Sequence, residues 1–230
     1  MKASAIVVAA GSGKRLGLAT PKAFIEIGGS SLLLRVLRVF NGVEGVNEIV
    51  LAVPAGAQKL ARGEAQLAGL QIPIKITEGG AERQDSVRIA LALTSAESDL
   101  IIIHDAARPF ATPEMFRACL AAAAENGAAL VATPVADTLK RANDGIVTTT
   151  ILREGLWQAQ TPQAFRREVL IQAHGHAVQK ETVATDDAQL CEELGIPVKL
   201  VLGSPFNLKI TTPDDLAIGE AIALREKTTG

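Results

Sequence analysis

The residues with the clearest chemical meaning lie near the amino terminus, in Ala9-Ala-Gly-Ser-Gly-Lys-Arg15 and in the nearby Pro21-Lys22. Small residues let a backbone approach a ligand closely, so that its N–H groups can converge on an anion. The side chains of Lys14, Arg15 and Lys22 add fixed positive charge to this stretch. A small-residue turn that follows an apolar run and carries cations predicts a phosphate-binding loop after a first strand.

The spacing within this loop differs from that of both common nucleotide loops. In a Walker loop the lysine precedes Ser or Thr, whereas Lys14 precedes Arg15. In a dinucleotide loop the third glycine comes one place earlier than Gly17 does here. An ordinary strand-to-helix turn with surface cations is the alternative that this stretch alone leaves open.

A second polar group, His104-Asp-Ala-Ala-Arg108, begins within the most apolar strand of the sequence, predicted at 100–105. Ligands of open parallel sheets bind at the carboxyl ends of the strands. Asp105 can hold Mg²⁺ against phosphates there, and Arg108 can clamp a phosphate with two N–H groups. A turn or helix-cap role is the alternative for Asp105. We expect His104 to pack beneath the turn rather than to act as a base.

Two further segments extend this chemistry. Gly79-Gly-Ala-Glu-Arg-Gln-Asp-Ser86 is a second glycine turn, whose backbone groups and Ser86 hydroxyl can read the edge of a base; a turn that only caps a helix is an equal alternative. Lys209 lies in a predicted β segment, 207–210, where we favour an anion partner over an edge-protecting role. A cation-rich site with few carboxylates suits displacement at phosphorus, in which the protein positions groups and stabilises charge.

Composition excludes several other classes of protein. The chain has 230 residues with a formal net charge of -2, and aromatic residues make up 3% with no Tyr, so we expect no binding of nucleic acid. No run is long enough for a membrane span. The two cysteines, Cys119 and Cys191, lie in helical patterns and are expected to be buried and reduced. Residues 1–10 faintly resemble a signal peptide, but their apolar run is short and Gly11–Arg15 follow directly, so the sequence predicts a first strand there and a cytoplasmic protein.

Alternating strand and helix patterns must position these groups. The sequence predicts one α/β domain over 1–230, Rossmann-like, with a mainly parallel twisted sheet and helices on both faces. The predicted strands are 4–9, 48–53, 74–77, 100–105, 128–133 and 198–202. The predicted helices are 31–40, 57–68, 83–93, 113–126, 167–174, 186–194 and 213–225.

The pattern changes at 135–153. Two polar, Thr-rich β segments, 137–141 and 146–153, flank Asn143-Asp-Gly145, which is typical of a tight hairpin turn. Because these segments lack an apolar face, we expect a protruding β-arm that packs on a partner. A hairpin at the edge of the main sheet is the alternative, since strand propensity depends on context.

The first motif, A-A-G-x-G-x-R-x-G with Pro21-Lys22 after it, resembles the signature of sugar-nucleotide pyrophosphorylases and related nucleotidyltransferases. The order of motifs along nearly the whole chain narrows this resemblance to the 2-C-methyl-D-erythritol 4-phosphate cytidylyltransferase family of the non-mevalonate isoprenoid pathway. These motifs are 9–22, Gln84-Asp85-Ser86, 104–108, Asp137-Thr138, Arg153 with Leu156-Trp157, Thr161-Pro162-Gln163, Thr185-Asp186 and 207–209.

The resemblance implies transfer of a cytidylyl group from CTP to methylerythritol phosphate, with Mg²⁺ as cofactor and release of pyrophosphate. It implies that four cations take part in catalysis, namely Arg15, Lys22, Arg153 and Lys209. It implies nucleotide contacts by Ala9, Ala10, Gly11, Gly80, Ser86 and Asp105, and metal binding by Asp105. It implies contacts to methylerythritol phosphate by Arg108, Thr138, Thr161 and Thr185. The chain departs from the family at Ala81, where the family has an acidic residue.

The resemblance also implies a homodimer with exchanged β-arms. Two alternatives stay open at this point. A ribitol 5-phosphate cytidylyltransferase would share the fold and the first loop, although Leu156-Trp157 after Arg153 argues against it. A non-catalytic nucleotide sensor could lose Lys22, Asp105 or Lys209, and all of these are present.

Overall fold

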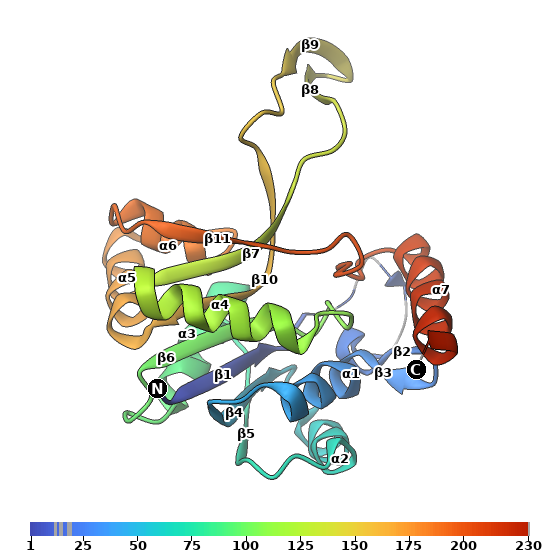
Figure 1. The fold of residues 1–230 in the computed structure, drawn as a ribbon, viewed down its shortest axis with the longest axis vertical. Helices are drawn as coiled ribbons and strands as arrows, with labels where there is room; N and C mark the ends of the chain where they lie inside the picture. The colour runs from blue at the N-terminus through green and yellow to red at the C-terminus, as the bar shows by residue number, and fades with distance from the viewer. Residues whose placement is uncertain (12, 14–15, 18–19, 230) are drawn as a thin grey trace.

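A seven-stranded sheet forms the centre of the molecule, in the order β11-β7-β10-β6-β1-β4-β5 (Figure 1). The computed structural model describes residues 1–11, 13, 16–17 and 20–229. β10 runs antiparallel to both of its neighbours, and the other pairs are parallel. The strands are β1 (Ala3–Val8), β4 (Val46–Val53), β5 (Ile74–Glu78), β6 (Leu100–Asp105), β7 (Ala128–Pro134), β10 (Trp157–Arg166) and β11 (Val198–Leu202). The predicted α/β class with a mainly parallel sheet is confirmed.

Helices cover both faces of this sheet. One core cluster joins Ala5 and Val7 of β1 to α1, α2 and α4, and the other joins Ile6 of the same strand to α3, α5 and α6. Alternate residues of one strand therefore enter different cores, which explains the unbroken apolar runs at 5–8, 49–53 and 100–103. The helices are α1 (Leu32–Val39), α2 (Gln58–Ala68), α3 (Arg83–Leu93), α4 (Pro113–Asn126), α5 (Arg167–Lys180), α6 (Asp187–Glu193) and α7 (Pro213–Thr229), with short 3-10 turns η2 (Lys22–Phe24) and η3 (Phe40–Gly42).

β1 and β6 pair in parallel and end at the same edge of the sheet. Beyond the strand ends, the Ala9 N–H donates to the Ala52 carbonyl (2.8 Å) and the Ala106 N–H donates to the Val8 carbonyl (2.9 Å). The start of the glycine-rich loop and the His104–Arg108 motif therefore lie side by side, as the sequence predicted from the end points of the two strands.

The structure corrects the prediction of a β segment at 207–210. This segment is irregular, so Lys209 does not lie in a strand. Its hydrogen bonds go to side chains and turns instead: Asn207 Nδ2 donates to Gln160 Oε1 (3.0 Å) and to the Thr161 carbonyl (2.9 Å). The Ile210 N–H donates to the Ala107 carbonyl (2.8 Å). The structure also contains a small hairpin that the sequence did not reveal, β2 (Glu26–Ile27) with β3 (Ser30–Ser31).

The β-arm is a two-stranded hairpin of β8 (Leu139–Asn143) and β9 (Ile146–Ile151) that stands far out from the body (Figure 1). Asp144 and Gly145 have φ values of 47° and 78°, which a tight hairpin turn requires. Both strands are exposed along nearly their whole length, including Ile146 at 72%. The predicted protruding arm is therefore confirmed. In the single chain, its apolar side chains Ile146 and Val147 are exposed to solvent.

Candidate active site

Two cavities open at the carboxyl edge of the sheet and meet at three charged side chains, Arg83, Asp105 and Lys209. The first, of about 370 Å³, is otherwise lined by Val8, Ala9, Ala10, Gly11, Lys22, Ala23, Gly80, Ala81, Glu82, Ser86, Ala106 and Ala107. The second, of about 210 Å³, is otherwise lined by Arg108, Ala159, Gln160, Thr161, Gln163, Thr185 and Asp186. One wall of charged groups therefore separates two spaces, each of a size for part of a small substrate.

Asp105 is the centre of that wall. Its carboxylate is buried and accepts from Arg83 Nε at 3.0 Å and from Lys209 Nζ at 2.6 Å. Burial alone would raise the pKa of this carboxyl, but the two cations outweigh burial and hold the pKa well below its usual range. Asp105 is therefore an anion at every physiological pH, and it holds Lys209 at the boundary of the two cavities.

His104 supports the turn from below, as predicted. The Asp105 N–H donates to Thr161 Oγ1 (3.1 Å), which lies 3.0 Å from His104 Nδ1, while His104 Nε2 lies 3.0 Å from the Arg108 carbonyl. A carbonyl only accepts, so the neutral ring carries its proton on Nε2 and Nδ1 accepts from the Thr161 hydroxyl. Burial lowers the pKa of His104 to about 4, so the ring is neutral at pH 7.

Arg83 is a site residue that the sequence analysis missed. Its guanidinium bridges two buried carboxylates, since Nη1 also lies 2.6 Å from Asp187, which in turn accepts from His174 Nε2 at 3.0 Å. Burial would lower the pKa of Arg83, but Asp105 and Asp187 raise it well above its usual value. Its buried Nη2 has no hydrogen-bond partner. A signal was present: Arg83 is the first residue of α3, where the helix dipole disfavours a cation.

The second glycine turn is built by close packing. A Cβ on Gly79 would lie 2.4 Å from the Ala10 Cβ, and one on Gly80 would lie 2.3 Å from the Asp85 Cβ. Both positions therefore require glycine, because no side chain fits. Ser86 Oγ accepts from the Gly80 N–H (3.1 Å) and lies 3.1 Å from the Glu82 carbonyl, so its hydroxyl holds the turn that lines the first cavity.

The described part of the first loop also lines the first cavity. Ala9, Ala10 and Gly11 approach it through their backbone, and Lys22 enters from η2. A Cβ on Gly13 would lie 2.9 Å from the Lys22 Cβ, so loop and lysine pack directly on each other. Arg15, the other predicted cation of this loop, lies outside the described residues.

Two nitrogen atoms of the Arg108 guanidinium donate hydrogen bonds to backbone carbonyls of the protein itself. Nη1 donates to the Asn207 carbonyl (2.8 Å) and Nη2 to the Ala159 carbonyl (3.2 Å), whereas the buried Nε has no partner. Burial lowers the pKa of Arg108 from its usual value. The first bond joins the turn after β6 to the segment that carries Lys209, and the second joins that turn to β10, so Arg108 also shapes the second cavity.

The remaining predicted contacts are distributed unevenly. Thr161 and Thr185 line the second cavity. The Thr161 hydroxyl already donates to His104 Nδ1 and accepts from the Asp105 N–H. Thr185 is exposed, and its hydroxyl donates to Gln189 Oε1 (3.1 Å). Thr138 and Arg153 belong to the arm and line neither of these two cavities; the Arg153 guanidinium donates to the Ala136 carbonyl of its own arm. The structure brings together every predicted group of the body that it describes, and leaves those of the arm apart.

The two cysteines lie apart from this site. Cys119 and Cys191 are buried and not disulfide-bonded, and burial raises the pKa of each thiol to about 12. Among the described residues, no three His, Cys, Asp or Glu side chains gather as a metal-binding group. In the described part of the chain, no helix is both long enough and apolar enough to cross a membrane.

Comparison with known proteins agrees with the geometry. The family model of 2-C-methyl-D-erythritol 4-phosphate cytidylyltransferase matches residues 3–225. The enzyme of that name from Deinococcus radiodurans is 48% identical over 221 residues, covering 96% of this chain and 89% of the relative, and that from Pelotomaculum thermopropionicum is 43% identical over 223 residues, covering 96% and 94%. The crystal structure of the Thermus thermophilus enzyme superposes with a TM-score of 0.82 at 37% identity, covering 97% of this chain and all of that one. This chain therefore belongs to the 2-C-methyl-D-erythritol 4-phosphate cytidylyltransferase family and is a nucleotidyltransferase.

Proposed function

We propose that this chain transfers the cytidylyl group of CTP to the phosphate of 2-C-methyl-D-erythritol 4-phosphate. The observation that carries the proposal is the pair of cavities that meet at Arg83, Asp105 and Lys209. A phosphate oxygen of the acceptor attacks the α-phosphorus of CTP, the bond from that phosphorus to the bridging oxygen breaks, and pyrophosphate leaves. The attacking phosphate is already an anion, so no base is required, which fits a site whose adjacent histidine, His104, is buried and neutral.

CTP would occupy the first cavity. The backbone of 9–11 would lie along the nucleotide, and the tight turn at Gly80 and Ser86 would hold cytosine. Lys22, with Arg15, would stabilise the pentavalent transition state as charge develops on its oxygens. Ala81 can offer only its backbone where the family has an acidic side chain, so base recognition here rests on the turn itself.

Methylerythritol phosphate would occupy the second cavity, with Arg108, Thr161 and Thr185 at its wall. Lys209 would align the acceptor phosphate, because its ammonium lies between the two spaces. The acceptor phosphate would compete with Asp105 for the Lys209 ammonium. The Lys209 side chain is 40% exposed and can reach either anion. For Thr161 we propose a role in holding Asp105 as well as in lining the cavity.

The donor set fits a Mg²⁺ ion that arrives with the nucleotide. Mg²⁺ commonly binds through one or two carboxylates together with substrate phosphates and water. Asp105 supplies one such carboxylate, and its oxygens have acceptor capacity beyond the two ion pairs. When bound, the ion would neutralise phosphate charge, while Lys22, Arg83 and Lys209 supply the fixed cations around it.

We also propose a homodimer in which arms exchange. Arg153 and Thr138 stand on an exposed arm away from the cavities of their own chain, and the arm carries Ile146 and Leu152 at 72% and 83% exposure. Apolar side chains of this kind favour burial against a second copy. Arg153 of one chain would then complete the second cavity of its partner, in a cytoplasmic enzyme whose cysteines stay reduced.

Mixing two inactive variants tests the exchange. In a Lys22→Ala/Arg153→Ala mixed dimer, one site receives both defects and the other receives neither. Random pairing makes half of the dimers mixed, each with one good site of two, so activity should recover to about a quarter of wild type. Subunit exchange demonstrated by mass spectrometry without recovery of activity would rule out a shared site.

A single coupled assay tests the reaction itself. Pyrophosphate release should require CTP together with methylerythritol phosphate, and ribitol 5-phosphate in its place should give little. Preference for ribitol 5-phosphate would select the alternative cytidylyltransferase. Nucleotide binding without pyrophosphate release from any acceptor would select the sensor.

A further inference from the structure

A small hydrophobic cluster, separate from the two cores of the sheet, lies between α7 and the site. It consists of Ile27, Leu32, Phe110, Ile210 and Ala223. Three of these residues follow closely on cations of the site in the sequence. Ile210 is next to Lys209, Phe110 comes shortly after Arg108, and Ile27 ends the short segment that begins with Lys22 in η2.

Gly219 of α7 is the point where those three segments converge. A Cβ built on Gly219 would lie 2.8 Å from Ile27 Cδ1, 3.2 Å from Ile210 Cδ1 and 3.6 Å from Phe110 Cε2. The two isoleucines are completely buried, so a methyl group at this point must displace their Cδ1 atoms inside the cluster. The three nearest atoms to this one missing methyl group thus belong to the three cation-bearing segments.

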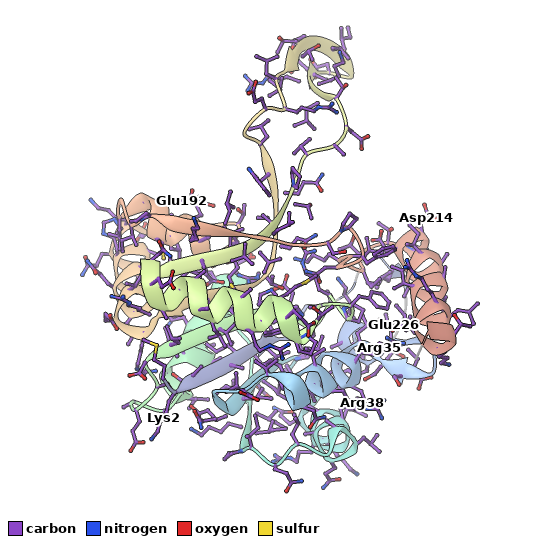
Figure 2. The ribbon with its side chains drawn as sticks, in the orientation of Figure 1. Lys2, Arg35, Arg38, Glu192, Asp214 and Glu226 are labelled. Carbon is purple, nitrogen blue, oxygen red and sulfur yellow. The ribbon has the colours of Figure 1, made fainter. Side chains whose placement is uncertain are left out.

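Polar contacts hold α7 in this place. Asp215 Oδ2 accepts from the N–H groups of Thr211 (2.7 Å) and Thr212 (2.8 Å), just after Ile210. Gly28, beside Ile27, donates its N–H to Glu220 Oε2 (3.0 Å). Figure 2 shows Arg35 of α1 close to Glu226 of α7, an ion pair of 2.9 Å. Polar contacts that precede Gly219 in α7 and others that follow it therefore hold the helix in place.

We infer that Gly219 is a positioning residue for the reaction. Ile27, Ile210 and Phe110 pack closely on the backbone of α7 at Gly219. This packing sets the spacing of the three cations that lie near them in the sequence, Lys22, Lys209 and Arg108. This inference rests on the proposed function for its reaction but not for its geometry. A methyl group at 2.8 Å must move its neighbour by most of 1 Å to reach an ordinary contact, and a shift of that size in reacting groups costs up to about 100-fold in rate.

Gly219→Ala is the test, with Gly175→Ala and Gly63→Ala as matched controls. The control glycines lie in α5 and α2, and a Cβ on either meets nothing within 4 Å. The controls should keep kcat within about twofold and gain about 2 °C in Tm, since alanine favours a helix. Gly219→Ala should lower kcat about tenfold, measured well below its Tm, with a smaller change in KM.

Rescue separates positioning from simple loss of stability. Ile27→Val removes the Cδ1 atom that the new methyl group would strike, so Gly219→Ala/Ile27→Val should return kcat to within about threefold of wild type. Gly219→Ala with wild-type kcat and only a lower Tm overturns the inference, and so does a loss of kcat that Ile27→Val leaves unchanged. If Gly219→Ala does not fold, Ile210→Val, which loosens the same contact, should lower kcat several-fold, and an unchanged kcat overturns the inference.

A second readout keeps the inference apart from the proposed reaction. If the wild-type chain releases no pyrophosphate, the proposed function fails, and binding of inorganic pyrophosphate decides this inference instead. Displaced cations should raise the Kd for pyrophosphate about tenfold in Gly219→Ala and leave it unchanged in Gly175→Ala. Equal Kd values in both variants overturn the inference.

Discussion

His104→Gln should flatten the pH dependence of stability below neutral pH. Folding lowers the pKa of this histidine from 6.5 to about 4, because the ring is buried. The unfolded chain therefore binds a proton at a higher pH than the folded chain does, so stability falls as the pH decreases from 6.5 towards 4. Above pH 6.5 the contribution of His104 is fully present.

The magnitude follows from the two pKa values. Integrating the difference in bound protons from pH 7 to pH 5 gives a loss of about 2 kcal/mol in the free energy of unfolding for His104 alone. Gln cannot titrate, so the variant should lose about 2 kcal/mol less than wild type over this interval, although it is less stable at pH 7. Asp105, whose pKa is lowered, loses its contribution only in much stronger acid.

Urea unfolding at pH 7, 6 and 5 in one buffer series measures the effect. Phe116→Leu is the matched control, because Phe116 packs on the His104 ring at 4.9 Å between centroids and does not titrate. That variant should be less stable than wild type at every pH but should keep the wild-type slope. Equal slopes for His104→Gln and wild type would refute the account of a neutral, buried histidine beneath the Asp105 turn.

Three further predictions concern the site. Lys22→Ala or Arg15→Ala should lower kcat by about 100-fold, with a much smaller change in the KM for CTP, as measured by steady-state pyrophosphate release. An unchanged kcat would show that the residue stabilises the bound substrate and the transition state equally and does not take part in catalysis. Arg83→Leu should reduce the free energy of unfolding in urea by about 3 kcal/mol, because two buried carboxylates lose their shared cation, and Asp187→Asn in that background should recover part of the loss. CTP should support at least about 100-fold faster pyrophosphate release than ATP, because a purine does not fit the tight turn at Gly80; equal rates would refute this base pocket.

Local sequence signals were sufficient for most elements of the fold. The bounds predicted for β6, β11, α3 and α4 agree with the structure at every residue. The signals are short-range: β6 begins with four apolar residues in a row, β11 is apolar except for Lys199, and Pro113 and Gly127 mark the two ends of α4. The glycine-rich turns and the cations after them were equally readable, because close approach of a backbone requires small residues in sequence.

The sequence by itself therefore determined the fold class, the family and the edge of the sheet where the site lies. Tertiary structure decided how the charged groups pair. The junction of Lys209 with Asp105, and of Arg83 with Asp105 and Asp187, joins segments far apart in the chain. No local pattern specifies such pairs, because their energy depends on burial and on which cation the fold brings within hydrogen-bond distance. The segment at 207–210 has apolar residues typical of a strand, yet its Asn207 carbonyl accepts from Arg108 Nη1 and its Ile210 N–H donates to the Ala107 carbonyl, and this competition exists only in the folded chain.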